Sequence, residues 1–245
     1  MADDIREQNI AYYDAEAKKY DDVRYATASG RRADIFHKKL LDEMVYADLA
    51  RDARLLELGC GTGRLLEYVA SKGFHVHGID VSEGMAEIAR NRLAALETGT
   101  AEITVYDGGV LPMDDDSFDA AYAILVVNLI PDYQDTFQQV ARVLRPGGTF
   151  FFNVPNLTSI YFPVGCYVNL RKKTTTSNTA GYRYSHWFSP KEWRAALADC
   201  GLEVETLRGE PPYARWIDDC QPINARGLGQ LFSKSVFIKA RKRDS

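Results

Sequence analysis

The feature that most constrains the fold is an alternation of short apolar runs with amphipathic segments in the first two thirds of the chain. Runs of strand length occupy residues 53–59, 74–80, 101–107, 118–127 and 147–155, and segments with helical spacing occupy residues 63–73, 82–96 and 133–144. Strands that alternate with helices through short turns build parallel sheets with helices on both faces. The sequence therefore predicts an α/β fold with a doubly wound, mostly parallel sheet.

The flanking segments extend this plan. Residues 31–50 predict a helix, residues 189–201 a helix with a capping box, and residues 202–210 and 235–240 two final strands, which gives seven strands in all. In the first of these helices His37 is expected at the surface. The apolar face is expected to hold Ile35, Phe36, Leu40, Met44, Val45 and Leu49.

Four regions follow from this reading. We expect an N-terminal helical cap (1–50), a ligand-binding core (51–155), a lid insertion after strand five (156–188) and the remainder of the sheet domain (189–245). The insertion lacks clear periodicity, and loops of that length inside compact domains are often functional.

The turn "GCGTG" at residues 59–63 joins the first strand to a helix. Gly59 and Gly61 permit the backbone angles of a sharp turn and let a ligand approach the main chain. Asp80 ends the second strand and Asp107 follows the third, so both lie at the edge where open α/β sheets bind ligands. Taken alone, the glycines also fit a purely structural turn.

Longer segments carry a family resemblance. Residues 55–90 ("LLELGCGTG…EIAR"), residues 106–119 ("YDGGVLPMDDDSFD") and residues 141–156 ("ARVLRPGGTFFFNVPN") resemble the cofactor-binding half of class I S-adenosylmethionine-dependent methyltransferases. This resemblance implies a Rossmann-like sheet, S-adenosyl-L-methionine as cofactor and S-adenosyl-L-homocysteine as product. "YYDAEAKKYDDVR" at residues 12–24 is similar to the entry helix of small-molecule members.

The resemblance also implies residue roles. Asp80 would hold the ribose hydroxyls, Asp107 would accept from the adenine amino group, and Leu125 would border the sulfonium. The cofactor-binding residues implied are Tyr20, Glu57, Gly59, Cys60, Gly61, Asp80, Val81, Met85, Asp107, Gly108 and Leu125. Two positions depart from the family pattern: Tyr106 replaces the usual glycine, and Asn128 stands where many relatives carry a histidine.

On the acceptor side, His186 is the candidate general base, because it lies just before the capped helix at the presumed substrate side. A structural aromatic cluster is the alternative interpretation of that position. Asn128, Tyr184 and Trp187 are the candidate substrate-binding residues.

Composition excludes several classes of function. A net charge of −4 attracts neither nucleic acid nor an acidic membrane, and no apolar run reaches the roughly 20 residues that span a bilayer. Four irregularly spaced cysteines predict no metal site and a cytoplasmic location. The sequence does not predict an oligomeric state.

The leading hypothesis is a methyltransferase that moves the cofactor's methyl group to an O or N atom of a small molecule. The alternatives are a methyltransferase acting on RNA or protein, a non-catalytic protein that binds S-adenosylmethionine, and a nicotinamide oxidoreductase. The G-x-G-x-G spacing and Asp107 count against the last of these.

Overall fold

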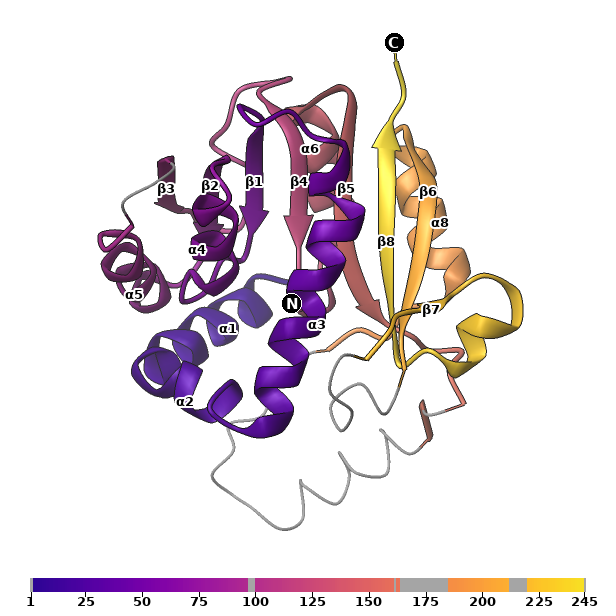
Figure 1. The fold of residues 1–245 in the computed structure, drawn as a ribbon, viewed down its shortest axis with the longest axis horizontal. Coiled ribbons are helices and arrows are strands. Elements are labelled where there is room, and N and C mark those ends of the chain that lie inside the picture. The colour runs from indigo at the N-terminus through magenta and orange to yellow at the C-terminus, as the bar shows by residue number, and fades with distance from the viewer. Residues whose placement is uncertain (1, 97–99, 161, 164–184, 212–219, 245) are drawn as a thin grey trace.

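A computed structural model describes residues 2–96, 100–160, 162–163, 185–211 and 220–244. Their centre is one eight-stranded sheet in the order β3-β2-β1-β4-β5-β8-β6-β7 (Figure 1). The strands are β1 (Arg54–Leu58), β2 (His75–Asp80), β3 (Thr100–Val105), β4 (Phe118–Ala123), β5 (Leu144–Pro155), β6 (Leu202–Glu210), β7 (Ile223–Asn224) and β8 (Ser235–Lys242).

The first five strands of the sheet run parallel, and β8 lies antiparallel between β5 and β6. The predicted α/β fold with a mostly parallel sheet is confirmed. The predicted count of seven strands is wrong, because β7 adds a two-residue strand that pairs antiparallel with the edge of β6.

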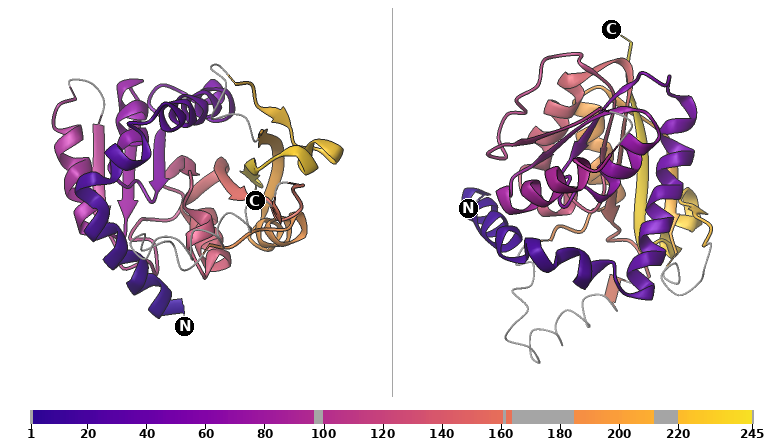
Figure 2. Two further views of the ribbon diagram at one scale, coloured as in Figure 1. Left: turned by 90° about the horizontal axis from the view of Figure 1, so that it is seen from below. Right: turned by 60° about the vertical axis from the view of Figure 1, so that its left-hand side comes forward.

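Helices cover both faces of the sheet (Figure 2). α3 (Ala28–Met44) and α4 (Arg64–Ser71) pack on one face, against side chains such as Leu55 and Phe151. α6 (Tyr133–Val143) and α8 (Pro190–Asp199) pack on the other, against side chains such as Leu56 and Phe152. Alternate residues of the same strands enter the two layers, as the period of two along a strand requires.

α5 (Glu83–Leu93) follows β2, and its N-terminus is capped as the sequence suggests, since the Met85 N–H donates to the Ser82 hydroxyl at 3.1 Å. The capping box of α8 also forms between Ser189 and Glu192. Short 3-10 turns complete the chain: η1 (Ala17–Lys19), η2 (Tyr46–Asp48), η3 (Val127–Leu129) and η4 (Gly227–Phe232).

The N-terminal helices α1 (Ala2–Glu16) and α2 (Tyr20–Arg24) lie below the carboxyl ends of β1 and β4, where the arrowheads point in Figure 1. α1 has no buried residue, so it contributes nothing to the apolar core. No helix among the described residues is long and apolar enough to cross a bilayer.

Two details of α3 differ from the sequence prediction. Ile35 is 58% exposed, whereas His37, expected at the surface, is 1% exposed and packs against Phe237 of β8 with 5.8 Å between ring centroids. The side chains that face the sheet are Phe36, His37, Leu40, Leu41 and Met44. The helix is therefore rotated slightly from the face that apolar spacing suggested.

The predicted lid insertion falls largely outside the described residues. Its two ends meet: the Leu157 N–H donates to the Phe188 carbonyl at 3.0 Å, and the Phe188 N–H donates to the Pro155 carbonyl at 3.0 Å. The segment between them thus begins and ends at one point beside β5.

Candidate active site

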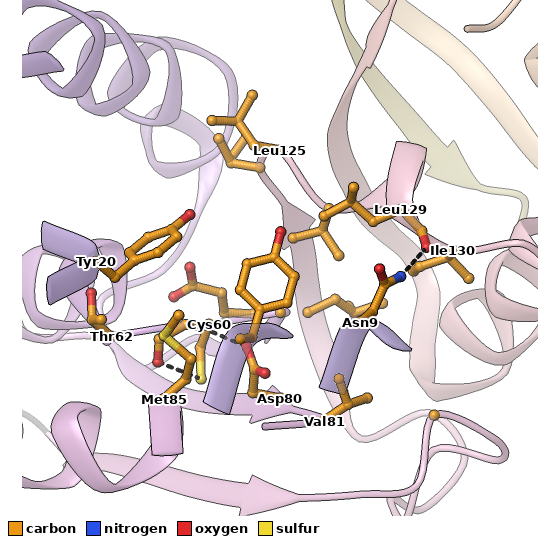
Figure 3. Close-up of a pocket in the computed structure, with 18 of the residues that line it drawn as sticks. Asn9, Tyr20, Cys60, Thr62, Asp80, Val81, Met85, Leu125, Leu129 and Ile130 are labelled. Atoms are coloured by element: carbon orange, nitrogen blue, oxygen red, sulfur yellow. Dashed lines mark hydrogen bonds between the residues drawn. The ribbon is translucent and has the colours of Figure 1, made fainter. Parts of the chain in front are cut away.

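A cavity lies at the carboxyl ends of the parallel strands, between the sheet and the N-terminal helices (Figure 3). One side is formed by the ends of β1 and β2 and the start of α5, where Asp80, Val81 and Met85 lie. The opposite side is formed by the chain after β4, with Leu125, Leu129 and Ile130. Tyr20 and Asn9 reach it from α2 and α1.

The glycine turn forms the floor of this cavity. Gly59 and Gly61 have φ of 64° and 53°, values that L side chains rarely adopt. The Cys60 N–H donates to the Ile79 carbonyl at 3.0 Å, which ties the turn to β2. The absence of side chains at Gly59 and Gly61 leaves the main chain open to a ligand.

Asp80 joins this turn to the second strand. Its carboxylate accepts the Gly61 N–H at 2.7 Å and the Ser82 N–H at 3.0 Å. Burial raises the pKa of Asp80, and these backbone hydrogen bonds oppose the rise. Each carboxylate oxygen keeps a further lone pair, so the group can still accept from two hydroxyls of a ligand.

Glu57 is the second buried acid, with 4% of its surface exposed. It accepts the Tyr122 hydroxyl at 2.9 Å. Desolvation raises the pKa of Glu57 well above its usual range, and no cation among the described residues counters that rise. A buried carboxylate without a cation suits a ligand that brings its own ammonium group.

α1 spans the cavity through polar contacts at its middle and near its C-terminal end. Near its C-terminal end, Asp14 accepts the Ser82 hydroxyl at 2.5 Å and the Gly84 N–H at 3.0 Å at the start of α5. At its middle, the Asn9 amide donates to the Leu129 carbonyl at 3.1 Å. Single polar residues therefore hold a helix that lacks an apolar face.

Arg92 of α5 links α2 and α4 to the glycine turn. Its guanidinium donates to the Thr62 carbonyl at 2.9 Å, to Glu67 at 3.1 Å and to Asp21 of α2. The Thr62 hydroxyl also donates to Asp21, at 2.8 Å. One side chain thus links the N-terminal helices, the glycine turn and α4.

Comparisons with known proteins bear on this arrangement. Residues 56–152, from β1 to β5, match the family described as "Methyltransferase domain". A SAM-dependent methyltransferase from Thermotoga maritima, titled a possible histamine N-methyltransferase, superimposes with a TM-score of 0.70 at 20% identity, covering 96% of this chain and 99% of that one. Residues 56–152 therefore form a methyltransferase domain, of the class I S-adenosylmethionine-dependent type.

Curated methyltransferases are similar in sequence. A demethylmenaquinone methyltransferase from Tropheryma whipplei (strain Twist) is 33% identical over 160 residues, covering 61% of this chain and 66% of that protein. A ubiquinone biosynthesis O-methyltransferase from Paracidovorax citrulli (strain AAC00-1) is 30% identical over 159 residues, covering 64% of this chain and 66% of that protein. The similarity thus spans just under two thirds of either relative.

The residues present fit the cofactor of this methyltransferase class. Asp80 offers lone pairs for the ribose hydroxyls, and the buried Glu57 offers a carboxyl group that would pair with the methionine ammonium, whose charge would oppose the raised pKa of Glu57. Ten of the eleven cofactor residues implied by the sequence line one cavity: Tyr20, Glu57, Gly59, Cys60, Gly61, Asp80, Val81, Met85, Gly108 and Leu125.

Asp107 is the exception. It is exposed, and its carboxylate accepts the Gly109 N–H at 2.8 Å within its own turn, beside rather than along the cavity wall. The neighbouring Tyr106, which replaces a family glycine, does line the cavity, and burial raises its pKa to about 12. Tyr106 therefore stays a neutral phenol.

The candidate acceptor residues lie elsewhere. The Asn128 side-chain amide donates to the Ser185 hydroxyl at 3.2 Å, and the Asn128 backbone carbonyl accepts the His186 backbone N–H at 2.9 Å. The His186 ring stacks on Tyr133 with 5.7 Å between centroids and lies 3.1 Å from the Glu192 carboxylate. Neither Asn128 nor His186 lines the cavity. The ring environment of His186 matches the structural aromatic alternative.

Trp187 packs edge-on against Phe162 at 5.0 Å, also away from the cavity, and Tyr184 lies outside the described residues. Among the described residues no cluster of three or more histidine, cysteine or acidic side chains is arranged to hold a metal ion.

Sequence reasoning missed several lining residues: Arg6, Asn9, Tyr13, Tyr25, Thr62, Arg64, Tyr106, Leu129, Ile130 and Pro131. Tyr13 falls inside the entry-helix segment that resembles small-molecule members. Arg6 and Asn9 belong to no motif, and only the fold brings α1 over the strand ends.

Proposed function

We propose that this protein transfers the methyl group of S-adenosylmethionine to an O or N atom of a small molecule with an apolar body. The observation that carries the proposal is the single cavity in which Glu57, Asp80 and the bare glycine turn face an apolar wall. Methyltransferases acting on quinone precursors among the relatives support a small acceptor.

The cofactor supplies an electrophilic methyl group, so the protein's task is to bind, orient and exclude water. Glu57 and Asp80 would bind the two polar ends of the cofactor. The apolar wall formed by Leu125, Leu129 and Ile130 would hold the acceptor's body away from water.

The described lining contains neither histidine nor lysine, and the pKa of its Tyr106 lies at about 12. We infer an acceptor that arrives with its own lone pair available, such as a neutral amine or an ionised phenol. The rate should then follow the pKa of the acceptor rather than that of a protein group.

Calorimetry with S-adenosylhomocysteine tests the cofactor site, and Asp80→Ala should weaken binding at least about tenfold, the cost of one lost hydrogen bond to a charged group. A methyl-transfer screen with labelled cofactor then tests acceptors of three classes: apolar hydroxy- and amino-compounds, total RNA, and a protein extract. Transfer to RNA or protein alone would contradict the small-molecule proposal. Tight binding without transfer to any class would support a non-catalytic role.

A further inference from the structure

Leu125 has a backbone conformation that leucine rarely adopts. Its φ is 62°, and Asp116, with φ of 49°, is the only other non-glycine residue with positive φ in the described part of the chain. Aspartate tolerates the left-handed region through local hydrogen bonding, whereas leucine has no such compensation. A glycine would make the same turn without this cost.

The buried amide of Asn153 holds this conformation. The Leu125 N–H donates to Asn153 Oδ1 at 2.7 Å, and Asn153 is 1% exposed on β5. The regular pairing of β4 with β5 ends before Leu125, at the pair Ala123 and Phe152. The Asn153 side chain therefore supplies the hydrogen-bond acceptor that the backbone of a neighbouring strand would otherwise provide for the Leu125 N–H.

The turn at Leu125 directs the chain into the cavity wall. Leu125 is 37% exposed and lies across the cavity from Asp80 and Met85 (Figure 3). The next residue, Val126, packs directly on the glycine turn at Gly59. Strained residues that persist at such a place belong to functional sites more often than to ordinary turns.

We infer that Asn153 is a positioning residue that holds Leu125 in the left-handed conformation, so that the leucine side chain forms the wall against the transferred methyl group. Glycine would make this turn without strain, so the leucine at this position serves through its side chain and not through the turn alone. This inference rests on the proposed function and adds a residue of β5 that does not line the cavity.

The strain is tested by comparing Leu125→Ala with Leu125→Gly in thermal unfolding. At ordinary positions glycine is less stable than alanine. At a left-handed position the order reverses, so we expect Leu125→Gly to unfold at the higher temperature. The usual order would show that Leu125 is unstrained and would overturn the inference.

The functional part is tested without an acceptor, by calorimetry with S-adenosylmethionine and S-adenosylhomocysteine, which differ by the methyl group. Leu125→Ala should change the ratio of the two dissociation constants by about fourfold, the factor for one methylene-sized apolar contact. Asn153→Ala should change it in the same direction. Asn153→Asp, which keeps an acceptor oxygen in place, should restore the wild-type ratio.

Asn156→Ala is the matched control, since Asn156 is equally buried and directly follows β5 but donates to the Gln230 and Ser233 carbonyls. It should leave the ratio unchanged. In a Leu125→Gly background, Asn153→Ala should not change the ratio further, because glycine adopts the left-handed conformation without the hydrogen bond to Asn153.

Wild-type protein that binds neither ligand would contradict the proposed function itself. Normal wild-type binding with an unchanged ratio in Leu125→Ala would overturn this inference alone. If Asn153→Ala fails to fold, Asn153→Asp and the alanine–glycine pair at position 125 still decide the outcome.

Discussion

Val126 occupies the space that a side chain at Gly59 would need. A Cβ built on Gly59 would lie 2.5 and 2.8 Å from the two γ-carbons of Val126, far inside van der Waals contact. The segment that leaves β4 is therefore fitted against the turn that leaves β1. The segments that follow β1 and β4 therefore shape the cofactor cavity together. A larger side chain in one of them requires a smaller one in the other.

This fit predicts different costs for two glycines of one turn. Gly59→Ala meets both a positive φ and the Val126 clash, whereas Gly61→Ala meets a positive φ with no atom within 4 Å. We expect Gly61→Ala to lower the free energy of unfolding by about 1–2 kcal/mol. Gly59→Ala should cost about 1–3 kcal/mol more, from overpacking. Urea unfolding measures both, and Val126→Ala should relieve only the Gly59 variant.

Glu57→Gln should separate stability from cofactor binding. Because burial raises the pKa of Glu57 in the folded protein, its charged form weakens folding, and the wild type loses stability as the pH rises above 4.5, the ordinary pKa of a glutamate side chain. Glutamine keeps an oxygen for the Tyr122 hydroxyl and has no such charge. The variant should therefore be more stable than wild type at pH 8, as measured by urea unfolding at that pH.

The advantage of Glu57→Gln should disappear as the pH approaches 4.5, and Glu87→Gln, which replaces an exposed glutamate, is the control variant. The same variant should bind S-adenosylhomocysteine about tenfold or more weakly, since it loses the charge for the ammonium group. Equal stability of variant and wild type across this pH range would argue against a buried, ionisable Glu57.

Arg92→Ala should release the N-terminal helices. It removes the link from α5 to Asp21 and to the Thr62 carbonyl, so residues 2–27 should be cut faster in limited proteolysis, and S-adenosylhomocysteine should bind more weakly. Arg90→Ala is the matched control on the same helix, because its partner is the exposed Glu83. Unchanged proteolysis in Arg92→Ala would show that the contacts of Asp14, Asn9 and Thr62 hold this region without Arg92.

His186→Phe should act on stability more than on rate. The phenyl ring keeps the stacking on Tyr133 and the edge-on contact with Phe188, and it loses the Glu192 contact. We expect kcat/KM for the acceptor to stay within about threefold of wild type, against the 10²–10⁴-fold loss typical of a missing general base. A large loss with an altered pH profile would restore His186 as the catalytic base.

The sequence predicted the sheet core well because each strand and helix there carries its own periodic signal. Gly59, Gly61 and Asp80 fall at strand ends, and parallel strands place their ends at one edge, so their meeting follows from the element order. The two-residue β7 has no such signal, and its pairing depends on where the edge of β6 lies.

The N-terminal side of the cavity was harder to predict for a physical reason. α1 docks through Asp14 and Asn9 rather than through an apolar stripe, and one polar contact leaves no pattern along a sequence. The prediction that His37 lies at the surface was wrong because the buried face of a helix depends on what packs against it. Here that partner is Phe237, which is distant in the sequence. The predicted roles of Asn128, Trp187 and the lid stay predictions.

The place of β8 has a consequence for synthesis on the ribosome. β8 follows all other strands in sequence yet lies between β5 and β6 in the sheet. A nascent chain that has not yet released residues 235–242 carries two open strand edges at the middle of its domain, and open edges pair with other chains. Translation arrest or truncation before Ser235 should therefore yield an aggregating product rather than a smaller, active domain.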